Sequence, residues 1–260
     1  MILISARRVV VAVLLLTPLA WAGALAAGQV VGAAAAGAQV ATVTGWVVDA
    51  NSWLGQGVRG PQYQARSAAS AEAGTPLVIL TDDGSIMFPV QLTPPAGTHA
   101  SNLKLVSYAE QRVTVGGRLI RQGREKAIVI EYVTRANDPA AAPPTPARET
   151  PGVEFVARVT EMNSWLGQNR SGFEQRYNTM ACADRGDPLV LVSDSGYVLY
   201  PVTKSAPSGL TANGLLVNYA EQTVRVKGTL IERGNARAII INSVTAYAPS
   251  VVQGSLLSEK

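Results

Sequence analysis

The chain offers few residues that could do chemistry, and their number excludes several classes of site. It has one histidine, His99, and one cysteine, Cys182. A single imidazole and a single thiol exclude an intramolecular disulfide, a cysteine zinc cluster and any site that needs two histidines. His99 follows a Pro-Pro-Ala-Gly-Thr stretch that indicates an exposed loop, and Cys182 lies between alanines, which is typical of a small buried side chain. We therefore expect no metal and no cofactor.

Carboxylates are the remaining candidates for acid–base chemistry. Asp82 and Asp83 are adjacent, but they precede a glycine, and Asp-Gly is typical of a hairpin turn. Glu110 and Glu221 stand in separate copies of the motif Tyr-Ala-Glu-Gln and so do not form a pair. A tyrosine bonded to backbone and a glutamate paired with a nearby arginine would explain that motif. The sequence therefore assembles no catalytic constellation, and we predict that the chain is not an enzyme.

The most informative pattern is an internal duplication. Asn51 to Gln56, with the sequence Asn-Ser-Trp-Leu-Gly-Gln, recurs letter for letter at Asn163 to Gln168, 112 positions later. At that offset 18 of the 44 positions from 47 to 90 are identical, and at an offset of 111 so are 15 of the 28 from 107 to 134. Matches this dense predict a tandem duplication. We expect a domain at 41–136, a Pro-rich linker at 137–152 and a second domain at 153–248.

Hydrophobic periodicity predicts the elements of each copy. Val113, Val115 and Leu119 alternate with polar residues, which indicates a half-buried strand. Strands are expected in the first copy at 43–48, 77–80, 86–90, 112–119 and 127–130, with equivalents in the second. Helices are expected at 61–73 and 173–184, with shorter pieces at 102–109 and 214–220. In the segment 173–184, Phe173, Tyr177, Met180 and Ala181 share one face, which we expect to be buried.

Five strands with a helix between the third and fourth resemble the oligonucleotide/oligosaccharide-binding (OB) fold, a five-stranded Greek-key barrel. The stretch Cys182 to Leu189 (Cys-Ala-Asp-Arg-Gly-Asp-Pro-Leu), followed by Tyr200-Pro201, resembles bacterial exported OB-like domains of unknown function. The first copy departs from that pattern, because Ser70 stands where the second has Cys182. The expected fold class is mainly β, with two tandem OB-like five-stranded small barrels that each carry short helices.

The repeated Trp loops are the first candidate for a functional surface, with Trp53, Leu54, Trp165 and Leu166 as contact residues. A Trp on the loop after the first strand lies where OB folds take ligands. The same Trp, flanked by Asn-Ser and Gly, could instead cap the open end of a small barrel. Both interpretations stay open from the sequence.

A local basic cluster is the second candidate. Arg112, Arg118, Arg121 and Arg124 lie with Lys126 on the last hairpin of the first copy. The first copy has nine Lys or Arg against seven acids and the second nine against eight, so neither carries the charge excess of a nucleic-acid-binding domain. A solvated strand face, an acidic protein partner and anionic lipid head groups remain as interpretations, and we expect no nucleic acid.

The N-terminus indicates export. Residues 9–20 are almost wholly apolar, follow Arg7 and Arg8, and lead to small residues near 24–26. No charge occurs between Arg8 and Asp49, so residues 1–27 fit either a cleaved signal peptide or a retained anchor. Both place the rest of the chain in the periplasm, on the outer face of the inner membrane. A Gly/Ala-rich spacer at 28–40 follows.

Two functions remain open. The first is a non-catalytic extrinsic subunit that holds or bridges proteins of an inner-membrane complex, such as a respiratory or photosynthetic one. Two small units on a semi-rigid linker could contact two places at once, and the tail 249–260 offers the apolar contacts Val251, Val252, Leu256 and Leu257. The second is a periplasmic module that binds a small ligand, peptide or glycan through Trp53 and Trp165. It requires both Trp loops to be open to solvent.

Overall fold

The computed structural model describes residues 39–92, 98–137, 146–203 and 209–248. From residue 39 onward, the described residues belong to one compact unit that contains both copies of the duplication. Within the described part of the chain, no helix has the length and apolar character needed to span a bilayer. The expected signal or anchor at 1–27 and the tail 249–260, with Val251, Val252, Leu256 and Leu257, lie outside the described residues.

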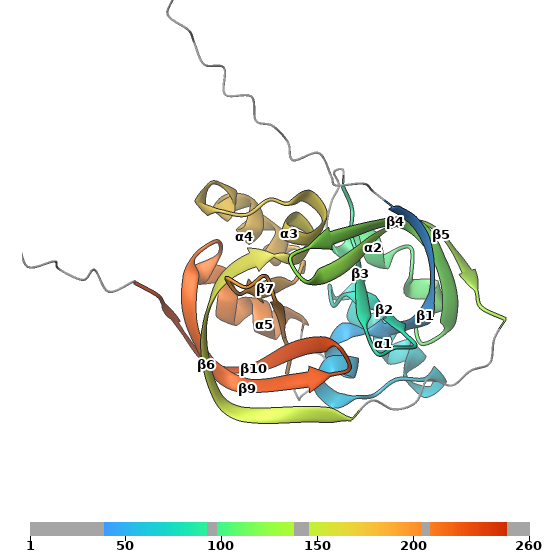
Figure 1. Ribbon diagram of the computed structural model, residues 1–260, viewed down its shortest axis with the longest axis horizontal. Helices are drawn as coiled ribbons and strands as arrows, with labels where there is room; N and C mark the ends of the chain where they lie inside the picture. The colour runs from blue at the N-terminus through green and yellow to red at the C-terminus, as the bar shows by residue number, and fades with distance from the viewer. Residues whose placement is uncertain (1–38, 93–97, 138–145, 204–208, 249–260) are drawn as a thin grey trace, which may run out of the picture. The chain divides into compact units, whose positions relative to one another are not determined.

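The protein is mainly β, with five strands in each copy (Figure 1). In the first copy they are β1 (Gln39–Asp49), β2 (Leu77–Thr81), β3 (Ile86–Pro89), β4 (Arg112–Gln122) and β5 (Glu125–Arg135). The pairing order is β1-β2-β3-β5-β4, and β4 pairs again with β1, so the sheet closes. The pairs are antiparallel except β3 with β5, where Phe88 lies opposite Ala127.

The second copy repeats this arrangement. Its strands are β6 (Ala147–Glu161), β7 (Leu189–Val192), β8 (Val198–Pro201), β9 (Thr223–Arg233) and β10 (Ala236–Ala246). β6 pairs with β7 and β9, and β8 pairs in parallel with β10, so the same order closes a second sheet. The duplication seen in the sequence is therefore a duplication of topology.

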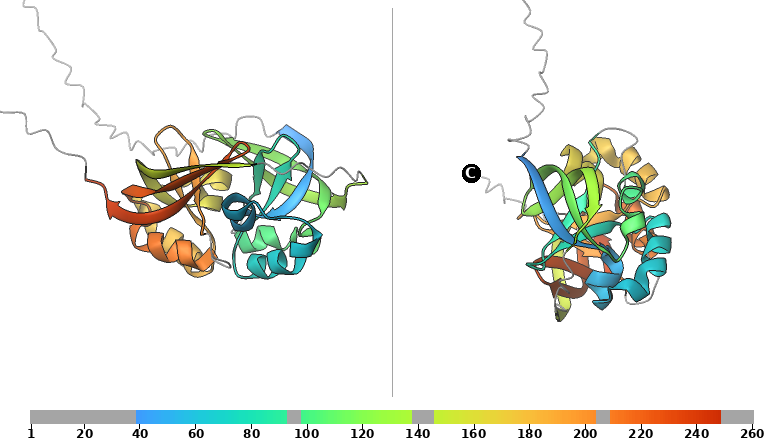
Figure 2. Two further views of the ribbon diagram at one scale, coloured as in Figure 1. Left: turned by 90° about the horizontal axis from the view of Figure 1, so that it is seen from below. Right: turned by 90° about the vertical axis from the view of Figure 1, so that its right-hand side faces the viewer.

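Short helices lie at corresponding places in the two copies and gather beside the strands (Figure 2). The first copy has η1 (Ser52–Gln56), η2 (Pro61–Tyr63), α1 (Gln64–Glu72), α2 (Thr98–Asn102) and η3 (Val106–Tyr108). The second has α3 (Met162–Gln168), η4 (Phe173–Gln175), α4 (Arg176–Asp184), α5 (Gly209–Leu216) and η5 (Val217–Tyr219). The segments expected at 61–73 and 173–184 are thus helical.

Each sheet encloses its own apolar core. Leu77, Ile79, Val113 and Val115 are fully buried in the first, together with Leu105 from the turn after α2. Leu189, Leu191, Val224 and Val226 occupy the corresponding places in the second, with Leu216. The alternating residues of β4 and β9 supply these side chains, as their period of two predicts.

Two expectations from the sequence are wrong. The linker is shorter than 137–152, because β6 begins at Ala147 and pairs with β9 from Ala147 opposite Arg233. The strand accommodates Pro151 and Gly152 at a register shift between Thr150 and Val153. The expected buried face of α4 is also wrong: Phe173 is 75% and Tyr177 86% exposed, while Thr179, Cys182 and Ala183 are buried.

Glycine is required where the sheet backbones approach closely. A β-carbon on Gly117 would lie 2.1 Å from the carbonyl oxygen of Val129, and one on its equivalent Gly228 would lie 2.2 Å from that of Ile240. We expect Gly117→Ala to lower the free energy of unfolding by about 1–3 kcal/mol, because β4 and β5 must separate to admit the methyl group.

A matched glycine without this constraint provides the control. Gly214 lies exposed in α5, and nothing would lie within 4 Å of an added β-carbon. Gly214→Ala should therefore raise the free energy of unfolding by about 0.5–1 kcal/mol through helix propensity. Urea denaturation of both variants measures the two effects, and equal losses in both would contradict the backbone argument.

Candidate functional site

The two Asn-Ser-Trp-Leu-Gly-Gln motifs form short helical turns immediately after the first strand of each copy. An acidic residue at the end of that strand caps each turn. Asp49 Oδ1 accepts the backbone N–H of Ser52 at 2.5 Å, and the Glu161 carboxylate accepts those of Asn163 and Ser164 at 2.7 and 2.6 Å. A carboxylate at a helix start satisfies N–H groups that have no partner within the helix.

The asparagine of each motif reaches into the other copy. Asn51 Oδ1 accepts the N–H of Thr203 at 3.0 Å, and Asn163 Oδ1 accepts the N–H of Gln91 at 2.6 Å. Asn163 also donates from Nδ2 to the carbonyl oxygen of Gln91 at 3.2 Å. Thr203 lies 112 positions after Gln91, so the two contacts are equivalent and the docking is reciprocal.

Close packing explains why both motifs contain glycine. A β-carbon on Gly55 would lie 3.2 Å from the carbonyl oxygen of Thr203, and one on Gly167 would lie 3.1 Å from Cβ of Val90. η1 packs against β9 and β10, while α3 packs against β4 and β5. Each motif therefore packs so closely against the opposite copy that a β-carbon at this position would be in tighter than ordinary contact.

The tryptophans lie in a hydrophobic cluster to which both copies contribute. Trp53 is 2% and Trp165 7% exposed, and Leu54 and Leu166 are also buried there. The same cluster contains Phe88 from β3 and Tyr200 from β8, whose ring centroids lie 6.3 Å apart, and ten residues from each copy in all. The requirement that the Trp loops be open to solvent is thus not met, because the second copy covers what a single barrel would leave exposed.

The hairpin tips complete the interface between the copies. Arg124 N–H donates to the carbonyl oxygen of Gly196 at 3.2 Å, and Asn235 N–H donates to that of Gly84 at 3.2 Å. A β-carbon on Gly123 or Gly234 would lie 2.5 or 2.0 Å from those same oxygens. Each β-turn that follows the second strand of one copy therefore contacts the last hairpin of the other.

One contact occurs on both sides of the interface but is made by different side chains. Arg233 of β9 donates from Nε to the carbonyl oxygen of Leu54 at 3.3 Å, at the end of η1, where a cation is favourable. At the equivalent position of the first copy, Gln122 donates to Oδ1 of Asn169 at 2.5 Å, the residue that caps the end of α3. The two sides of the interface are related in geometry and not identical in side chains.

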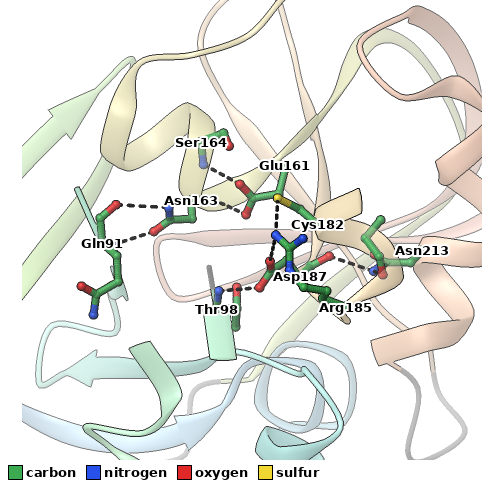
Figure 3. A network of polar contacts seen from close by, with 10 residues as sticks. Gln91, Thr98, Glu161, Asn163, Ser164, Cys182, Arg185, Asp187 and Asn213 are labelled. Atoms are coloured by element: carbon green, nitrogen blue, oxygen red, sulfur yellow. Dashed lines mark hydrogen bonds and ion pairs between the residues drawn. The ribbon is translucent and has the colours of Figure 1, made fainter. Parts of the chain in front are cut away.

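A polar network surrounds the Glu161 side of the interface (Figure 3). Asp187 accepts the N–H of Thr98 from the first copy at 2.6 Å, and its other oxygen lies 3.8 Å from Arg185 Nη2. Arg185 also donates to Sγ of Cys182 at 3.1 Å. The equivalents of Cys182 and Asp187 in the first copy are Ser70 and Thr75, so the contacts of Arg185 with Cys182 and Asp187 are specific to the second copy.

Burial controls ionisation in this network. It raises the pKa of Glu161 from 4.5 to about 7, with a smaller contribution from the charge of Asp187. It also raises the pKa of the Cys182 thiol to about 11, and the nearby carboxylates of Glu161 and Asp187 act in the same direction. A thiol with that pKa is protonated at neutral pH, which makes it a poor nucleophile.

The glutamates of the Tyr-Ala-Glu-Gln motifs are buried structural acceptors. Glu110 accepts from Gly60 N–H at 2.7 Å and from Ser67 Oγ at 2.6 Å. Glu221 accepts from Gly172 N–H and from the hydroxyls of Thr160 and Thr179, each at 2.7 Å. The expected pairing with an arginine is replaced by hydroxyl and backbone donors that fix the helical segment to the barrel. The tyrosine hydroxyls do bond to backbone, at Val133 and Val244.

The basic cluster is not one continuous surface. Arg112 is buried and forms a two-pronged ion pair with Asp82 at 2.6 and 2.7 Å, and Arg124 stacks over Tyr197 of the second copy, 4.4 Å from the ring centroid. Arg118 is half-buried, and Arg121 is exposed. Two of the four arginines are therefore engaged by other side chains, Arg112 within its own copy and Arg124 on the second copy.

Other candidate features are small. A depression of about 340 Å³ on the first copy is lined by residues including Thr44, Asp83, Met87 and Lys126. Within the described ranges, no group of three or more His, Cys, Asp or Glu side chains is arranged to hold a metal ion. His99 falls in α2, and nothing is described of its side chain.

Comparison of the chain with protein-family models, with curated proteins and with solved structures gives no match. The site is therefore defined by its geometry alone. Sequence reasoning identified the repeated motif but placed it at an open barrel end. One signal could have predicted the interface: all six residues of the motif are identical in the two copies, which suits a contact that each copy makes with the other.

We expect loss of either interface asparagine to destabilise both copies together. Asn163→Ala removes the acceptor of the half-buried N–H of Gln91, and Asn51→Ala removes that of the Thr203 N–H, which should lower the free energy of unfolding by about 1–3 kcal/mol in each case. Urea unfolding followed by fluorescence should show one displaced transition. The exposed Asn218→Ala should change it by less than about 0.5 kcal/mol. Two separate transitions, only one of them displaced, would contradict a shared interface.

The raised pKa of Glu161 predicts a pH dependence with a definite sign. The folded chain binds this proton up to about pH 7 and the unfolded chain only to about pH 4.5, so the stabilisation is complete below pH 4.5 and is lost as pH rises to about 7. The loss should be about 3 kcal/mol. In Glu161→Gln, urea unfolding between pH 5 and 8 should show a flatter profile than wild type. Parallel profiles for the two proteins would exclude this assignment.

Proposed function

We propose that the chain is a non-catalytic, exported interaction protein, an extrinsic structural subunit that holds proteins of a larger membrane complex on the outer face of the inner membrane. The observation that carries the proposal is the reciprocal locking of the two copies. The side chains that the duplication repeats most faithfully are turned inward, where they join the copies, and Glu110, Glu161 and Glu221 accept hydrogen bonds within the fold. The outer faces of a locked pair keep a fixed separation, which suits a protein that holds others in place.

We propose OB-like barrels as the building unit. The order β1-β2-β3-β5-β4, the parallel contact of β3 with β5 and the helix between β3 and β4 support this assignment in the first copy, and the second copy has the same order. From the linker alone, we expected two separately placed units that could contact two partners. Because the copies share one hydrophobic cluster, any two contacts are presented by a single body and not by two flexibly joined units.

The N-terminal sequence supports the location. Arg7 and Arg8 followed by the apolar run 9–27 favour export, with the described residues on the outer side of the membrane. The ligand-binding alternative is not favoured, because Trp53 and Trp165 are 2% and 7% exposed.

Fractionation of native membranes tests the proposal. We expect this chain, solubilised in mild detergent and separated by size, to migrate with a complex much larger than 27.2 kDa. The mass of its N-terminus, measured in the same fraction, distinguishes a retained anchor from a cleaved signal. Migration of the processed chain by itself in the soluble periplasmic fraction would overturn the proposal. A high-salt wash that releases the chain from the membrane would indicate an extrinsic subunit.

A further inference from the structure

The exposed aromatic face of η4 and α4 has no structural explanation within the fold. Phe173 and Tyr177 lie four residues apart, so they share one side of the helical segment, and they are 75% and 86% exposed. They are the two most exposed large hydrophobic side chains among the described residues. Exposed apolar side chains that gather in this way mark interaction sites.

The duplication provides an internal comparison for this face. The equivalent residues in the first copy are Pro61 and Ala65, on a helical segment of the same length and position. The first copy folds into the same topology without either aromatic side chain. Folding therefore does not require Phe173 and Tyr177.

Arginines flank the aromatic pair. Arg158 is exposed and donates to Ser171 Oγ at 3.3 Å, two residues before Phe173, while Arg170 is exposed and Arg176 begins α4. Their equivalents in the first copy are Trp46, Val58 and Gln64, which carry no charge. Arg185 follows α4 and pairs with Asp187 at 3.8 Å, and the exposed acids are Glu174 and Asp184, so these four arginines face three acids. The face is therefore aromatic at its centre and net positive.

We propose that this face of the second copy, defined by Phe173, Tyr177, Arg158 and Arg170, docks on the anionic headgroup surface of a lipid bilayer. The inference rests on the proposed function, which places the protein at a membrane. Aromatic rings favour the bilayer interface, and arginines are attracted to anionic headgroups. Where residues 1–27 are retained as an anchor, the twelve residues 28–39 cannot span more than about 40 Å. The folded unit then stays within reach of the surface.

A fluorophore placed beside the aromatic pair tests the docking directly. Ala181 is exposed one turn after Tyr177, and its equivalent in the first copy, Ala69, is also an exposed alanine. The buried Cys182 is replaced by Ser, the residue type at Ser70, so that Ala181→Cys or Ala69→Cys carries the only label. The full chain is reconstituted into vesicles of phosphatidylcholine, alone or mixed with phosphatidylglycerol.

We expect an apolar shift of the fluorophore at position 181 in vesicles that contain phosphatidylglycerol, and none at position 69. The double variant Phe173→Ser/Tyr177→Ser should lose the shift. Removing one arginine, by Arg158→Gln or Arg170→Gln, should lower the docking constant about fivefold, and added salt should lower it further. Urea midpoints unchanged from the labelled parent show that these exposed substitutions leave the fold intact.

Several results would overturn the inference. Equal shifts at positions 69 and 181 would show general proximity and not a specific face, and equal shifts without phosphatidylglycerol would exclude the role of charge. No shift in vesicles, with a shift in native membranes, would identify an acidic protein as the occupant. These results can be told apart from those that test the proposed function. A double variant that loses the vesicle response and still migrates with the large complex supports both the lipid docking and the proposed function. A wild-type chain that responds to vesicles but migrates alone overturns only the proposed function.

Discussion

The structure depends on one reciprocal contact, in which each copy inserts its Asn-Ser-Trp-Leu-Gly-Gln turn against the strands of the other. Trp53 and Trp165 are large apolar side chains on loops, which a single small barrel cannot bury within itself. Mutual docking removes both from water at once and adds them to a cluster with Phe88 and Tyr200. Asn51 and Asn163 fix how the two copies align. Each side-chain oxygen accepts a backbone N–H of the other copy, and such a hydrogen bond tolerates little displacement. The hairpin tips follow from the same arrangement, since docking the turns brings Gly84 and Gly196 onto the opposite hairpins.

A duplicated unit with an interface between its copies must close each barrel and also join the two copies. Its residues divide into positions that serve these two requirements and positions that do not. Positions that serve the barrel or the reciprocal contact are the same in both copies, as with Gly55 and Gly167 or Glu110 and Glu221. Several positions beside the interface carry different residue types in the two copies. Asp49 corresponds to Glu161, and the neighbours Ser70 and Thr75 correspond to Cys182 and Asp187. The result is an interface related by geometry but unequal in charge, with the two buried acids Glu161 and Asp187 on one side and Asp49 at the corresponding place on the other.

Much of the fold could be predicted from the sequence, and the limits have physical causes. Alternation in β4 and the Asp-Gly turn predicted strands and hairpins correctly, because those signals are local. The extension of β6 through Pro151 was missed, since proline ordinarily ends a strand and only the pairing with β9 shows that a register shift admits it. The buried face of α4 was wrong because periodicity shows which residues share a side but not which side faces the core. The site was half predicted: the motif was found, but its partner was another part of the same chain, and a contact between Asn51 and Thr203 leaves no local signal.

The buried Trp loops also change what kind of interaction the chain can make. Two barrels joined by a flexible linker would gain strength from contacting two places at an adjustable distance, and the length of the linker would set that gain. Two barrels with a common hydrophobic cluster have no such freedom, so their outer faces can only match a partner of fixed geometry. Specificity then has to come from surface positions at which the copies differ, because an identical pair of faces would bind the same partner twice. Phe173, Tyr177, Arg158 and Arg170 are such positions, because the first copy has the uncharged, non-aromatic Pro61 and Ala65 at the places of the two rings. Duplication thus supplied one compact unit, and the exposed side chains of its two copies diverged, so that only the second copy carries the exposed pair Phe173 and Tyr177.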